Sequence, residues 1–154
     1  MVTSPTFIQS RRGVALMLAC ALLAACDNPP DDGSDEAIRQ RLVGSWAREY
    51  EEEGVQVQRL LVMEADGNFH EISRAVGAGG KTVERSGEGI WTYDGTNLKR
   101  KYTRFDGKQP SAPTVPFATF EITKLSRHEF AGRDNLRRLE VHYRRVADTT
   151  TGLP

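Results

Sequence analysis

The chain has 154 residues, and its 21 basic and 21 acidic side chains leave it with no formal net charge at pH 7. This length suits one domain with a single buried core. The basic residues are spread along the chain and form no block, so the composition predicts no nucleic-acid partner.

The first 25 residues predict export. Arg11 and Arg12 precede an apolar run over residues 13–25 that is too short for the ~20 residues of a membrane-spanning helix. A basic start, a short apolar centre and small residues at the end are typical of a secretory signal peptide. Ser10-Arg11-Arg12 also partly matches a twin-arginine signal, so the export route stays open.

The end of this segment, Leu23-Ala24-Ala25-Cys26, resembles the lipobox of bacterial lipoproteins. The resemblance implies that residues 1–25 are removed and that Cys26 carries a diacyl group and an amino-terminal acyl chain such as palmitate. Two or three acyl chains hold a protein on a membrane permanently. We therefore expect a periplasm-facing, lipid-anchored protein of the cell envelope, on the inner or outer membrane. An ordinary signal peptide, with Cys26 incidental, is the alternative.

Residues 26–36 are predicted to be a disordered tether. Positions 27–36 carry five acidic groups, no basic group and no apolar side chain except proline. Such a segment cannot offset the entropy of ordering by burial, and its charges repel one another.

A short helix and eight strands are predicted after the tether. Residues 35–43 can form two helical turns, capped by Ser34 or Asp35 and ended by Gly44. Period-two segments separated by hairpin dipeptides then follow. They cover residues 45–50, 55–64, 68–76, 81–93, 98–105, 117–125, 128–132 and 136–146. Because the connections are short and no crossover helix intervenes, we expect an all-β, antiparallel, up-and-down barrel of about eight strands.

The order of the motifs resembles the lipocalin-like domains of bacterial secreted proteins and lipoproteins. Gly44-Ser45-Trp46 opens the domain, an Asp66-Gly67 hairpin and a second motif, Gly89-Ile90-Trp91, follow, and Tyr143-Arg144-Arg145-Val146 supplies a final arginine. The resemblance spans about residues 42–146 and implies a barrel that often binds a hydrophobic or small ligand. We place the barrel domain at residues 37–146 and expect a flexible tail over residues 147–154.

Strand parity predicts which side chains face the interior. The predicted inward set is Trp46, Tyr50, Val55, Val57, Leu61, Met63, Phe69, Trp91, Tyr93, Leu98, Tyr102, Phe120, Ile122, Phe130, Leu139, Val141 and Tyr143. A packed core explains most of these residues. The same parity places charged groups inside, namely Arg48, Arg59, Glu71, Arg100 and Arg104. Buried charges must pair, reach the rim or meet a ligand.

If one end of the barrel stays open as a cup, arginines that line it would suit an anionic or amphiphilic ligand. The candidate ligand-binding residues are Trp46, Arg48, Tyr50, Arg59, Trp91, Arg100 and Tyr102. The competing interpretation is that β-bulges shift the register and leave the arginines at the barrel ends.

Motifs for nucleotide binding, metal binding and catalysis are either absent or lack the neighbouring residues that they need. Residues 75–82 match a relaxed phosphate-loop pattern, but no helix can follow them. His70, His128 and His142 lack metal-ligand spacing, and no catalytic motif is present. We therefore expect no enzyme, no cofactor and no metal. The expected function is binding of a small or amphiphilic ligand, or a passive role in the envelope. The alternative is a protein-interaction module, such as an inhibitor or immunity protein against an envelope enzyme.

Overall fold

The computed structural model describes residues 33–111 and 116–147. The predicted signal peptide, Cys26, most of the tether and the tail from residue 148 lie outside the described residues. One helix, α1 (Asp35–Leu42), precedes the strands. The strands are β1 (Gly44–Glu52), β2 (Val55–Met63), β3 (Asn68–Val76), β4 (Thr82–Tyr93), β5 (Asn97–Phe105), β6 (Phe117–Leu125), β7 (Glu129–Asp134) and β8 (Glu140–Val146).

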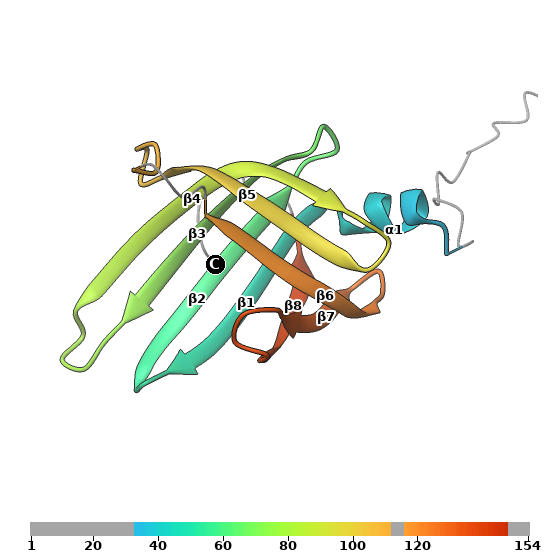
Figure 1. Ribbon diagram of the computed structural model, residues 1–154. Helices are drawn as coiled ribbons and strands as arrows, with labels where there is room; N and C mark the ends of the chain where they lie inside the picture. The colour runs from blue at the N-terminus through green and yellow to red at the C-terminus, as the bar shows by residue number, and fades with distance from the viewer. Residues whose placement is uncertain (1–32, 112–115, 148–154) are drawn as a thin grey trace, which may run out of the picture.

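The strands close into one antiparallel barrel in sequence order, with β8 paired to β1 (Figure 1). The predicted fold class is thus confirmed. All eight strands, α1 and the core between them lie within residues 33–147. A fragment that starts at residue 27 therefore contains every packing contact of the barrel. No helix in the described part of the chain is long and apolar enough to cross a membrane.

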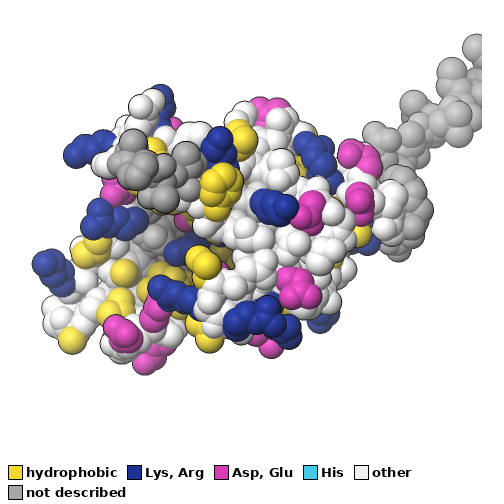
Figure 2. Space-filling model, in the orientation of Figure 1, with side chains coloured by type: hydrophobic (Ala, Val, Ile, Leu, Met, Phe, Trp, Pro, Cys, Tyr) yellow, Lys and Arg dark blue, Asp and Glu magenta, His cyan; other side chains and the backbone are white. Residues whose placement is uncertain are grey.

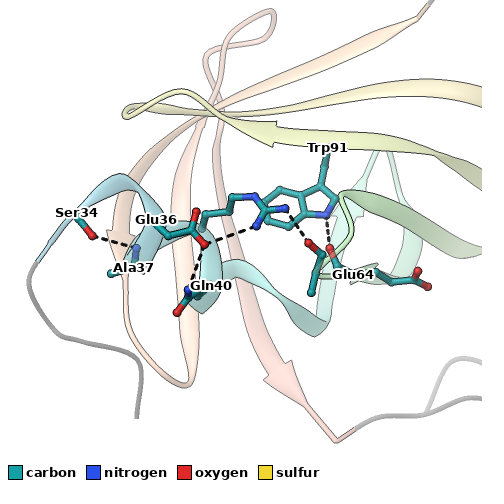
Figure 3. A network of polar contacts seen from close by, with 8 residues as sticks. Ser34, Glu36, Ala37, Gln40, Glu64 and Trp91 are labelled. Carbon is teal, nitrogen blue, oxygen red and sulfur yellow. Dashed lines mark hydrogen bonds and ion pairs between the residues drawn. The ribbon is translucent and has the colours of Figure 1, made fainter. Parts of the chain in front are cut away.

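Helix α1 lies at one end of the barrel, beside the β4–β5 turn (Figure 1). The Ser34 hydroxyl accepts a hydrogen bond from the Ala37 amide at 3.2 Å and caps the helix. Figure 3 shows Trp91 beneath the helix, and its indole N–H donates to the Glu64 carbonyl at 3.0 Å. The Arg39 guanidinium lies 5.2 Å from the Trp91 ring centre and donates to the Ala65 carbonyl. We call this end the closed end.

The apolar core fills the closed half of the barrel. Trp46 meets Phe130 edge-on with ring centres 4.8 Å apart, and Phe130 stacks on Tyr143 at the same distance. Arg145 covers the other side of Trp46, with its guanidinium 4.0 Å from the ring centre, and donates to the carbonyls of Arg41 and Val43. The buried members of the predicted inward set are Trp46, Leu61, Met63, Phe69, Trp91, Leu98, Tyr102, Phe120, Phe130, Val141 and Tyr143.

The opposite end is open, because the wall is taller on one side. Strands β1 to β5 have nine to twelve residues, whereas β7 and β8 have six and seven. The ladder between β1 and β8 joins only Ser45–Ala47 of β1, and the ladder between β5 and β6 stops at Lys101. Inner faces of β1 to β5 are therefore exposed beyond these points, and we call this end the mouth.

Two predictions of strand parity were wrong. Leu139 was expected inside but is 56% exposed, because β8 begins at Glu140 and residues 135–139 form a turn. The Asp134 carboxylate stabilises that turn by accepting from the amides of Leu136 and Arg137. Arg104 was also expected inside but points outward.

A β-bulge explains the position of Arg104. Glu88 pairs with Arg104 while the next residue, Gly89, pairs with Tyr102, so Thr103 is an extra residue in β5. The bulge turns Arg104 to the outer face, where it pairs with Glu88 at 3.1 Å, and turns Phe105 inward to stack on Tyr102.

Candidate ligand-binding site

A row of polar residues crosses the inner face of the tall wall. Arg48 of β1 pairs with Arg59 of β2, Arg59 with Ser73 of β3, and Ser73 with Arg85 of β4. Residues directly opposite each other in neighbouring strands point to the same face of the sheet. We call Arg48, Arg59, Ser73 and Arg85 the cationic row. On each strand, the cationic row lies two residues closer to the mouth than the inward-facing residues Trp46, Leu61, Glu71 and Gly87.

A buried ion pair forms the floor beneath the cationic row. Arg100 donates to one carboxylate oxygen of Glu71, and the Tyr102 hydroxyl donates to the other at 2.9 Å. The side chains of Arg100 and Glu71 are only 10% and 11% exposed. Burial by itself would raise the pKa of Glu71, but Arg100 and Arg59 outweigh it and hold that pKa below its ordinary value. The floor is therefore a charged pair at neutral pH.

The two arginines above the floor have no carboxylate partner of their own. The Arg48 guanidinium lies 3.9 Å from the centre of the Tyr50 ring. Arg59 donates to the Tyr50 hydroxyl at a long 3.4 Å, and its Nε is buried without a hydrogen-bond partner. Neither forms an ion pair or a hydrogen bond with a carboxylate in the described part of the chain. Like charges placed directly opposite each other are unfavourable.

Burial and charge act in opposite directions on Arg59. Burial, the largest single effect, would by itself lower the pKa of this guanidinium, but the negative charge of Glu71 together with Tyr143, Tyr50 and Tyr102 outweighs it and raises the pKa above its ordinary value. Glu71 already accepts from Arg100 and Tyr102. Arg59 therefore remains charged, and its only hydrogen bond to a side chain in the described part of the chain is the long one to Tyr50.

Two cavities meet at these arginines. An inner one of about 50 Å³ is lined by Arg48, Arg59 and Arg100 together with core residues. An outer one of about 300 Å³ opens at the mouth and is lined by Arg48, Tyr50, Arg59, Leu139 and Val141, among others. Its volume lies at the lower end of the range for ligand sites.

The three carboxylates that line the outer cavity, those of Glu51, Glu52 and Asp134, already have partners. Asp134 accepts from two backbone amides, Glu52 pairs with Arg137, and Glu51 accepts from Gln56. These acidic groups therefore leave Arg48 and Arg59 available to a ligand. In Figure 2, hydrophobic and basic side chains gather at the side of the molecule where the β3–β4 hairpin ends.

The structure brings five of the seven candidate residues together. Arg48, Tyr50 and Arg59 line the mouth, and Arg100 and Tyr102 form the floor. Trp46 and Trp91 instead lie in the core toward the closed end, and the Trp46 indole donates to the Leu42 carbonyl. Sequence reasoning missed Ser73, Arg85 and Asp134 as site residues. Parity counted across neighbouring strands, once the register was known, would have found the first two.

No metal centre is evident in residues 33–111 and 116–147, where no three histidine, cysteine, aspartate or glutamate side chains gather. His70 and His142 are exposed. Comparison with known proteins adds no assignment: no protein-family model matches the chain, and no curated protein matches it in sequence.

Proposed function

We propose that this protein is a lipid-anchored, periplasm-facing lipoprotein of the bacterial cell envelope whose lipocalin-like barrel binds a small anionic ligand at its mouth, without catalysis. The observation that carries this proposal is the pair Arg48 and Arg59, which face each other inside the mouth without a carboxylate partner. A carboxylate or phosphate group could accept two parallel hydrogen bonds from a guanidinium and would neutralise the opposed charges.

The supporting case for a lipocalin-like barrel comes from the motifs. Gly44 and Trp46 of the first motif and the final arginine, Arg145, meet at the closed end, where Arg145 covers Trp46 and donates to the Val43 carbonyl. The lipid anchor rests on the lipobox sequence at Cys26 alone. Mass spectrometry of the processed protein tests it, because an acylated amino terminus at residue 26 is expected and Cys26→Ser should abolish it.

Ligand binding can be tested with the soluble fragment of residues 27–154. Calorimetric titration with hexyl phosphate and hexanoate should show binding, and Arg48→Gln or Arg59→Gln should weaken it about tenfold or more, since a hydrogen bond to a charged group contributes about 1.5–3 kcal/mol. Arg74→Gln is the matched control, because Arg74 is a partly exposed arginine that pairs with Glu84 on the outer face of β3. Equal weakening by Arg74→Gln, or no binding by the unmodified fragment, would contradict the proposal.

Removal of one of the opposed charges has a second expected effect. Arg48→Gln should stabilise the ligand-free barrel slightly, by about 0.2–1 kcal/mol, because opposed like charges are destabilising. A substitution that weakens binding and stabilises the fold is typical of a ligand site, whereas a purely structural arginine would destabilise the fold when replaced.

A protein-interaction module is the second candidate function. Phe117 and Leu136 are 57% and 84% exposed and stand beside the mouth, which is the kind of exposed apolar surface that binds proteins. If this function holds, the anchored protein should recover one dominant envelope protein by affinity capture, and the variant with Phe117→Ser and Leu136→Ser should lose that partner.

A further inference from the structure

We propose that the ligand is a single-chain amphiphile with an anionic carboxylate or phosphate head, and that it enters the barrel head first. This inference rests on the proposed function and adds the ligand's class and its orientation. It derives from the sequence of layers that the strand register places along the inner face of the tall wall.

An apolar row lies directly outside the cationic row. Tyr50 pairs with Val57, Val57 with Ala75, and Ala75 with Val83, so these four residues share the inner face of β1 to β4. We call them the apolar row. Alternate residues on a strand are about 6.6–6.8 Å apart, so the two rows are separated by roughly the length of a small polar head group.

The order of these layers determines the orientation. In the direction from the mouth to the closed end, an incoming molecule meets the apolar row first, then the cationic row, and then the buried pair of Arg100 and Glu71. A hydrocarbon chain that entered first would have to pass charged groups, which lose their solvation without compensation. An anionic head that entered first would reach Arg48 and Arg59 and leave its chain against the apolar row.

The volumes support the same orientation. The inner cavity of about 50 Å³ can hold little more than one or two water molecules, so it has no room for a chain. The outer cavity of about 300 Å³ is lined by both arginines and by Tyr50, Leu139 and Val141, together with Glu51, Glu52, Asp134 and Arg137, which already have partners. The space for a chain is therefore on the mouth side of the charges.

Exposed hydrophobic residues continue the apolar surface outward. Five of the seven large hydrophobic side chains that are exposed in the described part of the chain lie at strand ends or loops of the mouth and continue this surface: Val83, Phe105, Phe117, Leu136 and Leu139. Ile90 and Val76 do not belong to it, and Val76 points to the outer face. Figure 2 shows hydrophobic side chains gathered at the end of the β3–β4 hairpin. A chain longer than the apolar row would thus continue over apolar surface.

Chain length is the first test. The fragment of residues 27–154 is titrated with butanoate, hexanoate, octanoate and decanoate below their micellar concentrations, with 1-octanol as the neutral probe. Each added methylene should tighten binding up to about fourfold, because burial of a methylene contributes about 0.8 kcal/mol. 1-Octanol should bind at least about tenfold more weakly than octanoate, since it lacks the charge that the arginines recognise.

Val83→Thr has a matched control in Val76→Thr. The two valines are 41% and 39% exposed, but Val83 belongs to the inner apolar row, whereas Val76 pairs with Thr82 on the outer face. Val83→Thr should weaken decanoate binding about threefold, and Val76→Thr should leave it unchanged. Butanoate, whose chain does not reach this row, should bind both variants equally.

Orientation is read directly with a nitroxide on the far end of the decanoate chain. In NMR spectra, head-first binding should broaden the amide signals of Val83 and Val76 and leave those of Trp46 and Leu61 sharp. The opposite pattern would overturn the inference.

Anion binding that does not depend on chain length would also overturn the inference and leave the proposed function intact. Failure of every anion to bind would refute both the proposed function and this inference. Octanol binding as tight as octanoate binding would refute recognition of the charged head.

Discussion

Replacement of Glu71 by glutamine tests how the buried charges beneath the cationic row are held. Removal of one partner of a buried ion pair typically costs about 3–5 kcal/mol, because the remaining charge is uncompensated. The Arg100 side chain is only 10% exposed, so bulk water does not replace the lost carboxylate. The amide oxygen of the new glutamine could still accept from the Tyr102 hydroxyl, so we expect a loss near the lower limit, about 3 kcal/mol at pH 7, in urea denaturation of the fragment of residues 27–154.

The pH dependence of the same variant gives an independent check. The pKa of Glu71 is lower in the folded protein than its ordinary value of 4.5, since Arg100 and Arg59 outweigh the effect of burial. The contribution of ionised Glu71 to the free energy of unfolding is therefore fully present above pH 4.5 and is lost as the pH falls through the folded-state pKa. The stability difference between the unmodified protein and Glu71→Gln should narrow below pH 4.5.

A matched control separates burial from charge. Glu88→Gln removes a carboxylate that pairs with Arg104 at 3.1 Å on the outer face, where both side chains are about half exposed. It should cost less than about 1 kcal/mol. The reasoning about the buried pair is refuted if Glu71→Gln costs no more than Glu88→Gln, or if the difference widens as the solution becomes more acidic.

Two further predictions, each with a matched control, concern the barrel itself. A Cβ on Gly132 would lie 2.0 Å from the Glu121 carbonyl oxygen, so Gly132→Ala should lower stability by about 3 kcal/mol, whereas the nearest atom to a Cβ on Gly77 is 4.0 Å away and Gly77→Ala should change stability by less than about 0.5 kcal/mol in thermal melts. Arg145→Lys should lose the hydrogen bonds to the carbonyls of Arg41 and Val43 and cost about 2 kcal/mol. Arg144→Lys, which alters only an exposed pair with Glu49, should leave the urea midpoint nearly unchanged, and a loss equal to that of Arg145→Lys would refute this account.

Strand alternation predicted the fold and most of the core, because side chains alternate faces wherever the strands are regular. Trp46, Leu61 and Phe130 are buried as predicted. The predictions failed at irregular backbone, where counting alone cannot follow the chain. The extra residue Thr103 reversed the parity of Arg104, and the turn after Asp134 delayed the start of β8.

The candidate site was only partly predictable for a related reason. Parity placed Arg48, Arg59 and Arg100 inside the barrel, and the structure places them there. Which of them has a partner depends on the register between strands. Glu71 reaches Arg100, 29 residues away in the sequence, across the inner face of β4, because β3 and β5 both pair with β4. A single sequence does not specify that register, and so it could not distinguish the paired arginine from the two that remain available.

The position of the lipid anchor relative to the mouth determines where a ligand can come from. Helix α1, into which the tether leads, lies at the closed end (Figure 1). The eight residue steps from Cys26 to Ser34 can span at most about 26–29 Å, and a nine-residue strand such as β2 is itself about 30 Å long. If Cys26 is acylated, as proposed, the closed end therefore stays near the bilayer and the mouth faces away from it.

Energy transfer to labelled lipids can measure this orientation in vesicles that carry the anchored protein. Ala65→Cys places a dye at the β2–β3 turn of the closed end, and Ala78→Cys places one at the β3–β4 turn of the mouth; both alanines are exposed. Transfer should be clearly stronger from position 65, and equal or stronger transfer from position 78 would refute the orientation. A mouth that faces away from its own membrane receives amphiphiles from the surrounding aqueous phase, and an amphiphile dissolved there presents its charged head as readily as its chain. Head-first entry is therefore compatible with this source.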